Sequence, residues 1–299
     1  MGGRPSGYGW VLLAAVMWST SGFFAKAPVF AGWPGAVLAF WRALFASVLL
    51  VLCVRRPSWS WGVVPMVFIF ALMSATYLMT MERAEASVAI WLQNTAPAWV
   101  FLVGVWWLRE PVQRHDWVML ALCGLGVGLI VQYQIRQAAI EAVALGLASG
   151  ALYGGVILSL RRLRQHEPAF LVALNHVGTS VLLFPVAWSS GYWPQGVQWV
   201  YLAAFGMLQL GLPYMFLARG LRSVPSHQAS LLTLIEPLLV PVWVYLAWGR
   251  HPSYQPPSGW TIAGGLFIIS GLLYRHVVSA RWAVGHTDNR QVPDETSAA

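Results

Sequence analysis

The sequence predicts an all-α integral membrane protein with ten transmembrane helices, arranged as two five-helix repeats of inverted topology. Three observations carry this prediction: the composition, the spacing of low-charge stretches and a weak internal repeat. Hydrophobic residues make up 58% of the 299 residues and charged residues only 9%, and the mean hydropathy is +0.62. Soluble domains carry about 25% charged residues, so the expected surroundings are a lipid bilayer.

Ten low-charge stretches of about twenty residues follow one another, and each is long enough as a helix to cross a hydrocarbon core of about 30 Å. Lipid offers the backbone no hydrogen-bond partners, so these stretches must be helices. The expected spans are 9–27, 35–54, 62–81, 86–107, 116–134, 142–161, 169–188, 197–217, 228–248 and 258–276. Prolines stand in the connections, where helices end: Pro34, Pro57, Pro111, Pro168, Pro194, Pro225 and Pro252.

The cationic residues predict on which side of the membrane each connection lies. With a cytoplasmic N-terminus, that side receives Arg4, Arg55, Arg56, Arg109, Arg114, Arg161, Arg162, Arg164, Arg219, Arg222, Arg275, Arg281 and Arg290, and the other side receives Lys26, Arg83, Arg136 and Arg250. Cytoplasmic connections carry an excess of Lys and Arg. We therefore expect a multi-pass protein of the cell (inner) membrane with both termini in the cytoplasm.

The composition also excludes several classes of function. The net charge of +8 is scattered between apolar stretches without a basic block, so no nucleic-acid partner is expected. Cys53 and Cys123 lie in or beside apolar stretches without metal-ligand spacing, so no metal and no cofactor are expected. The sequence has no HExxH, no GxSxG in an aqueous context and no paired intramembrane acids, so an enzyme is only a remote alternative.

The two halves resemble each other in a consistent order, which predicts an internal repeat. The matched residues are Trp18 with Tyr153, Pro34 with Pro168, Arg42 with His176, Tyr77 with Tyr214, Pro97 with Pro237 and Trp117 with Trp260. Five helices is an odd number, so the second copy enters from the opposite face, as in many secondary transporters. We expect a first repeat over 1–137, a second over 138–278 and a disordered cytoplasmic tail over 279–299. One chain can complete a pathway, so a monomer suffices.

Several motifs together resemble the EamA family of the drug/metabolite transporter superfamily over about residues 8–278. The motifs are Trp18-Ser19-Thr20, Arg42, Ala86, Ala89, Pro97 and the turn Arg109-Glu110-Pro111. Trp18-Ser19-Thr20 together with Tyr77 and Tyr214 is similar to the aromatic amino-acid exporters of the YddG type. Gly249-Arg250-His251-Pro252 departs from the family's acidic turn. The resemblance implies a pathway between the repeats, lined by spans one, three, four, six, eight and nine, with spans five and ten outside.

Polar and aromatic side chains concentrate in the spans that this resemblance assigns to the pathway. Trp18, Ser21 and Gly22 share one face of span one, because residues three and four apart lie on the same side of a helix. The candidate substrate-binding residues are Trp18, Ser21, Tyr77, Trp91, Asn94, Tyr153, His176, Gln209 and Tyr214. Each aromatic residue could instead pack in the core or in an interfacial belt. The repeat-related pairs favour a shared centre.

Three charged residues, Glu236, Arg42 and Lys26, are candidates for a charge or coupling site. Glu236 lies deep in span nine, where a carboxylate is costly and is normally paired, protonated or facing water. Three roles are open for Glu236. It binds the amine of a substrate, it couples transport to protons, or it forms a structural pair with Arg42, Lys26 or Arg250. Arg42 is a clamp for a substrate carboxylate or a structural residue that snorkels.

Three prolines inside spans predict helix kinks: Pro97, Pro237 and Pro241. A proline cannot bond to the carbonyl four residues earlier, which frees the carbonyls of Gln93, Thr233 and Pro237. Such carbonyls either accept a hydrogen bond from a substrate ammonium or are satisfied by a neighbouring hydroxyl.

The resemblance and these side chains together predict a secondary transporter that works by alternating access. The expected substrate is a small zwitterionic metabolite, first of all an amino acid with an aromatic or large neutral side chain. The alternative is an exporter of cationic drugs or of other metabolites of the superfamily. The related small multidrug pumps are expected to place a Glu in the first helix, which this sequence lacks.

Overall fold

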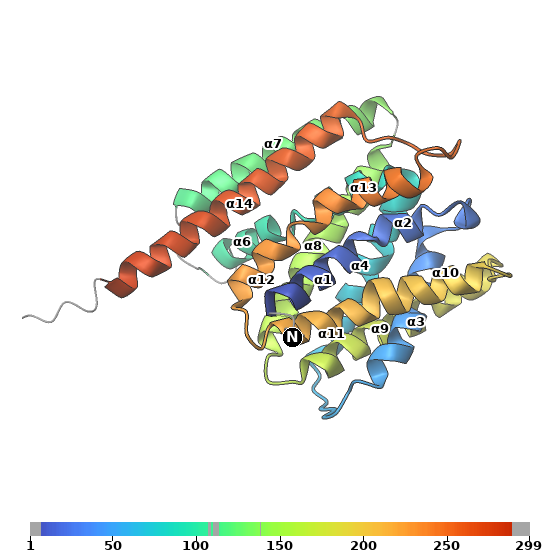
Figure 1. Cartoon of the computed structure of the whole chain (residues 1–299), viewed down its shortest axis with the longest axis horizontal. Helices are drawn as coiled ribbons and strands as arrows, with labels where there is room; N and C mark the ends of the chain where they lie inside the picture. The colour runs from blue at the N-terminus through green and yellow to red at the C-terminus, as the bar shows by residue number, and fades with distance from the viewer. Residues whose placement is uncertain (1–6, 107–108, 110–113, 138, 289–299) are drawn as a thin grey trace, which may run out of the picture.

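The computed structural model describes residues 7–106, 109, 114–137 and 139–288, and the regular structure of these residues is entirely helical (Figure 1). Nine stretches of this part of the chain are long and apolar enough to cross a membrane: Gly7–Ala25, Val63–Arg83, Ala86–Trp106, Asp116–Arg136, Ile140–Arg162, Pro168–Ser190, Gln198–Gly220, Leu231–Trp248 and Gly259–Val278. A shorter apolar helix, Gly35–Val51, stands at the expected second span. The all-α membrane fold is thus confirmed.

The elements of each half follow in the expected order. The first half contains α1 (Gly7–Ser19), α2 (Ser21–Ala25), η1 (Pro28–Phe30), α3 (Gly35–Val51), α4 (Val63–Arg83), α5 (Ala86–Gln93), α6 (Ala96–Trp106) and α7 (Arg114–Arg136). The second half contains α8 (Ile140–Arg162), α9 (Pro168–Ser190), α10 (Gln198–Ala204), the π-helix η2 (Phe205–Gly211), α11 (Leu212–Gly220), α12 (Ser226–Thr233), α13 (Glu236–Trp248) and α14 (Gly259–Asp288).

The helix contacts repeat between the halves. The matched helices α3 and α9 pack on each other, and so do α7 and α14, which run side by side at one edge of the bundle (Figure 1). α4 packs on α8, and the equivalent contact in the other copy joins α1 to α11. α5 packs on α8, α13 packs on α1, and α5 and α13 also contact each other, so the two repeats meet along these elements.

Three spans are interrupted near the middle. The first span breaks at Thr20, the fourth between Gln93 and Ala96, and the ninth between Thr233 and Glu236. Pro97 and Pro237 each stand at the second position of the helix after the break, where a helix needs no backbone N–H. α13 continues through Pro241 without a break.

The last helix is longer than the sequence predicts. The expected span ends near 276, with a tail over 279–299, but α14 continues to Asp288. Between Gly271 and Gly285 the sequence contains no glycine or proline that would end the helix. Residues 289–299 lie outside the described residues, as do Arg4 and the Glu110 and Pro111 of the predicted turn.

Candidate functional site

Arg42 lies in the middle of α3 and contacts residues of both repeats, Ser74 and Phe205; we call its surroundings the centre. Its side chain is buried, with 5% exposed. Its Nη2 donates a hydrogen bond to Ser74 Oγ on α4 at 2.8 Å. The guanidinium carbon lies 5.2 Å from the ring centre of Phe205 and 5.9 Å from that of Tyr77. The Nε atom is buried without a hydrogen-bond partner, so the guanidinium retains unused donor capacity.

An aromatic wall lies beside this arginine and joins the two repeats. The rings of Trp18 on α1 and Tyr214 on α11 meet edge to face, with centroids 5.0 Å apart. Tyr214 in turn lies 6.0 Å from the ring of His176. Across the centre, the hydroxyls of Ser21 and Tyr77 share a hydrogen bond of 2.9 Å. These contacts bring aromatic and polar side chains of both repeats together around Arg42.

Glu236 completes the centre from the second repeat. It is the first residue of α13, directly after the break in span nine. Its carboxylate interacts electrostatically with Arg42 and with Tyr77, Tyr153 and Tyr214. Tyr153, in the middle of α8, nevertheless has 39% of its surface exposed. The centre therefore contains opposite charges surrounded by three phenols.

Several buried polar atoms of this centre have no partner within the described residues. They are Arg42 Nε, both ring nitrogens of His176 and Gln209 Oε1. The Nε2 atom of Gln209 donates to the Trp18 carbonyl at 2.9 Å, and His176 packs edge to face on Phe70 with centroids 4.9 Å apart. A buried polar group without a partner costs about 1–3 kcal/mol, and water or a ligand removes that cost.

Two candidate residues of span four lie away from this centre. Trp91 is buried, its Nε1 donates to the Pro237 carbonyl at 2.9 Å, and its ring lies against Gly265 of α14. The carbonyl that Pro241 would leave free thus already accepts a bond from the protein. Asn94 donates from Nδ2 to the Ile90 carbonyl at 2.8 Å, within its own span.

The hydroxyls at the break in span one are also satisfied internally. Ser19 Oγ accepts from Trp243 Nε1 at 2.8 Å and donates to the Val16 carbonyl at 2.6 Å. Thr20 Oγ1 donates to the Met17 carbonyl at 2.7 Å. These hydroxyls fix the break, whereas Ser21 faces Tyr77 at the centre.

Sequence reasoning missed two kinds of residue near the site. Phe205 packs on Arg42, and nothing in the sequence separates it from the other 12 of the 13 phenylalanines. Trp243 and Trp248 donate to the first span, at Ser19 Oγ and at the Phe23 carbonyl (2.8 Å). With 18 tryptophans in the chain, no spacing singles out these two.

Lys26 lies at one end of the bundle, directly after the first span ends at Ala25; we call this the Lys26 end. It shares a cavity of about 320 Å³ with Glu82, Trp33, Trp248 and Tyr254. Burial lowers the pKa of Lys26 to about 8, and the nearby carboxylates of Glu85 and Glu82 oppose that shift. Glu82 Oε2 accepts from the Gly35 backbone N–H at 2.7 Å.

Glu85, in the connection between α4 and α5, is a buried carboxylate that the protein itself satisfies. Its Oε2 accepts from Gln134 Nε2 on α7 and from Thr261 Oγ1 on α14, both at 3.4 Å. Burial raises the pKa of Glu85, and these hydrogen bonds and the Lys26 charge oppose the shift. Glu85 therefore ties the two repeats together at the Lys26 end.

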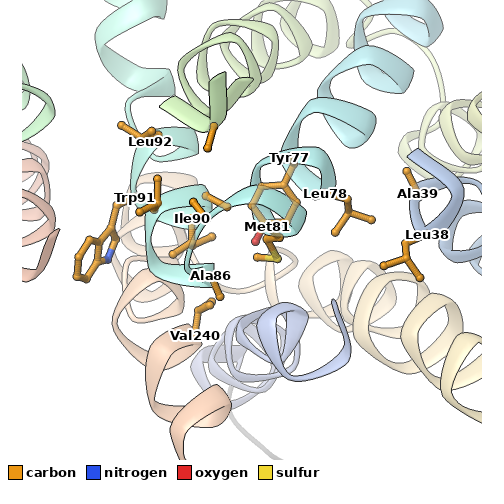
Figure 2. Packing of buried hydrophobic residues seen from close by; sticks show 14 of the residues in the cluster. Leu38, Ala39, Tyr77, Leu78, Met81, Ala86, Ile90, Trp91, Leu92 and Val240 are labelled. Carbon is orange, nitrogen blue, oxygen red and sulfur yellow. The ribbon is translucent and has the colours of Figure 1, made fainter. Parts of the chain in front are cut away.

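Between the Lys26 end and the centre, the helices pack without space for a side chain. A Cβ atom added at Gly22 on α2 would lie 2.7 Å from Val244 Cγ2, 2.9 Å from Val240 Cγ1 and 3.1 Å from Ala86 Cβ. Figure 2 shows Val240 next to Ala86, with Tyr77 and Ile90 in the same cluster of buried residues. α2, α5 and α13 thus close the centre off from the Lys26 end.

A family model, described as the EamA-like transporter family, matches residues 5–132 and 140–274. The chain is a member of this family. The two matched segments follow the two five-helix halves, and the family comprises transporters, so the prediction that the chain is a transporter and not an enzyme is confirmed. Within the described residues, no group of three or more His, Cys, Asp and Glu side chains could hold a metal ion.

Named relatives are also transporters. The uncharacterized transporter YwfM of Bacillus subtilis strain 168 is 27% identical over 292 residues, which cover 90% of this chain and 92% of that protein. The threonine/homoserine exporter RhtA of Escherichia coli strain K12 is 26% identical over 179 residues, 57% of each chain. A solved crystal structure, 15% identical, matches with a TM-score of 0.63 over 93% of this chain and 99% of that chain, which concerns the fold alone.

Proposed function

We propose that this EamA-family transporter exports amino acids, first of all those with aromatic or large neutral side chains. The observation that carries the proposal is the centre between the repeats, where an aromatic wall stands beside buried polar groups that lack partners among the described residues. Aromatic pairs contribute about 0.5–1.5 kcal/mol each, which suits an apolar substrate arm that must later be released. The name of the relative RhtA, a threonine/homoserine exporter, supports the amino-acid class.

The transport mechanism that we propose is alternating access. The packing of Val240 and Val244 around Gly22 supports a conformation closed toward the Lys26 end. In the opposite conformation α2, α5 and α13 separate there, and the breaks at Thr20, after Gln93 and after Thr233 supply the hinges. We propose an inner-membrane location with cytoplasmic termini, because Arg is rare at the Lys26 end. The Lys26 end then faces the outside.

Counterflow in proteoliposomes tests the function. Purified protein is reconstituted with an unlabelled amino acid inside, and uptake of labelled Phe, Trp, Thr and Met is followed with and without a pH gradient. We expect uptake of Phe and Trp well above that of protein-free liposomes, and slower Phe uptake by Trp18→Ala. Lack of uptake of any of the four amino acids would refute the proposal.

Export of cationic drugs is the second candidate, and Glu236 is the observation that favours it. A carboxylate that no described residue pairs with, beside aromatic rings, also suits an organic cation. Efflux of a cationic dye from cells that carry the wild type or Glu236→Gln distinguishes the two functions. Under the amino-acid proposal, neither protein lowers dye retention below that of cells without the transporter.

A further inference from the structure

The two opposite charges at the centre do not meet. Arg42 comes from the first repeat and Glu236 from the second, and their charges interact electrostatically. Nevertheless, their nitrogen and oxygen atoms form no ion pair within 4.0 Å, and neither side chain has an ion pair with another described residue. A structural salt bridge would close to contact distance, because only close geometry compensates for the desolvation of both charges.

Each charged group also retains hydrogen-bonding capacity. The guanidinium has five N–H donors, of which one bonds Ser74 while Nε has no partner. The carboxylate of Glu236 has two acceptor oxygens and accepts no hydrogen bond from the described residues.

A zwitterion fits a pair of opposite charges that are held apart. Its carboxylate can accept two parallel hydrogen bonds from a guanidinium, while its ammonium donates to the carboxylate of the protein. Both charged groups then gain a partner, and the net charge of the site does not change. An anion or a cation alone would pair with only one of the two groups and leave the other uncompensated.

We propose that Arg42 binds the α-carboxylate and Glu236 the α-ammonium of the transported amino acid, with its side chain against Trp18 and Tyr214. This inference rests on the proposed function and adds how the site recognises its substrate. One repeat supplies the contact for each charge, so the substrate backbone bridges the two repeats. The aromatic pair Trp18 and Tyr214 also spans both repeats, and it discriminates among side chains without contributing to charge recognition.

The test uses competition against counterflow of labelled L-phenylalanine in proteoliposomes. Three unlabelled competitors share the aromatic side chain and differ at the charged groups: L-phenylalanine, its methyl ester, in which the carboxylate is an uncharged ester, and 3-phenylpropionate, which lacks the ammonium. In the wild type we expect both analogues to compete at least about tenfold less well than L-phenylalanine, because each loses one charge-assisted contact.

Each variant should remove one of the two preferences for L-phenylalanine and keep the other. Glu236→Gln should abolish the advantage of L-phenylalanine over 3-phenylpropionate and keep its advantage over the ester. Arg42→Gln should abolish the advantage over the ester and keep that over 3-phenylpropionate. Arg42→Lys retains the charge but not the planar fork, so it should give an intermediate preference. Arg42 is buried, and melting curves show whether its variants fold.

Matched controls and clear failures complete the design. Arg83 and Glu141 form an exposed ion pair at the Lys26 end, with Nε and Oε2 3.7 Å apart, so Arg83→Gln and Glu141→Gln should retain the wild-type preference. If wild-type protein transports L-phenylalanine but the analogues compete equally well, only this inference is overturned. The same follows if both site variants keep the wild-type preference. If no amino acid is transported, the proposed function fails as well.

Discussion

Glu85 and Glu236 both lie where a helix begins in the equivalent spans four and nine, Glu85 directly before α5 and Glu236 at the start of α13, but their surroundings differ. Glu85 accepts hydrogen bonds from Gln134 and Thr261 and has Lys26 nearby. Glu236 accepts none from the described residues. The protein thus neutralises its own charge at the Lys26 end, where the repeats are fastened together. At the centre it leaves charges available, and we interpret that difference as the difference between scaffold and binding site.

The tryptophans show the same contrast. The indole N–H groups of Trp91, Trp243 and Trp248 donate to acceptors on neighbouring helices. The indole N–H of Trp18 donates to none of the described residues, and its ring faces Tyr214. We therefore expect changes of partnered residues to lower stability, and changes of unpartnered residues to alter substrate preference.

The largest effect is expected on the scaffold, where α7 and α14 touch through glycines. A Cβ added at Gly126 would lie 2.4 Å from the Gly264 carbonyl oxygen, so Gly126→Val should cost about 3 kcal/mol or more of folding free energy. Gly124→Val is the control, because a Cβ at Gly124 meets no atom within 4 Å. Melting in detergent compares the two. Equal melting temperatures would contradict the close contact.

A smaller loss of stability is expected for Trp91→Phe. This change keeps most of the ring but removes the donor to the Pro237 carbonyl, and a buried acceptor without its partner costs about 1–3 kcal/mol. The relative uptake of Phe and Thr should not change. Altered substrate preference at wild-type stability would instead assign Trp91 to the binding site, as the sequence predicts.

Trp18→Ala should change substrate preference rather than stability. Loss of the aromatic partner should raise the KM for Phe by about two- to tenfold and leave the KM for Thr nearly unchanged. Trp10→Ala is the matched control, because Trp10 and Phe216 form a similar ring pair, 5.1 Å apart, between the same two helices. An equal rise for Phe and Thr would mean that Trp18 supports the fold instead.

The smallest effect concerns pH and Lys26. Burial lowers its pKa from 10.5 to about 8, so between these pH values the unfolded chain binds a proton that the folded protein has lost. Its contribution to folding stability should therefore rise with pH in this window. Melting of the wild type and of Lys26→Met across the window checks the sign. If the melting temperature of the wild type falls relative to that of Lys26→Met as the pH rises, the burial of the ammonium is contradicted.

The fold was largely predictable because the sequence patterns that specify it extend over many residues. Twenty-residue apolar stretches determine the spans, and prolines in the connections mark their ends. Pro97 and Pro237, at equivalent places in the two halves, both stand just after a break. The end of α14 was not predicted, since the polar composition of residues 277–299 as a whole does not by itself end a helix, and residues 272–284 contain no glycine or proline.

The site was predictable only in part. Matching the two halves gave the pairs Trp18 with Tyr153 and Tyr77 with Tyr214, and it predicted a shared centre for these residues. In the structure Trp18 contacts Tyr214, a member of the other pair. The partners of Trp91 and Ser19 could not be inferred. Whether a tryptophan or serine faces the centre or a neighbouring helix depends on helix rotation and on breaks, which the helical spacing of a single span does not specify.

The central claim is that Glu236 binds substrate while Glu85 stabilises the scaffold, and thermal stabilisation by L-phenylalanine tests it directly. Glu85→Ala leaves Gln134 and Thr261 without their buried acceptor, so it should lower the melting temperature without ligand but retain the ligand-induced rise. Glu236→Ala removes no hydrogen bond from a described residue, so it should melt closer to the wild type than Glu85→Ala does, and show no ligand-induced rise. The reverse pattern, or a full rise in Glu236→Ala, would contradict the account.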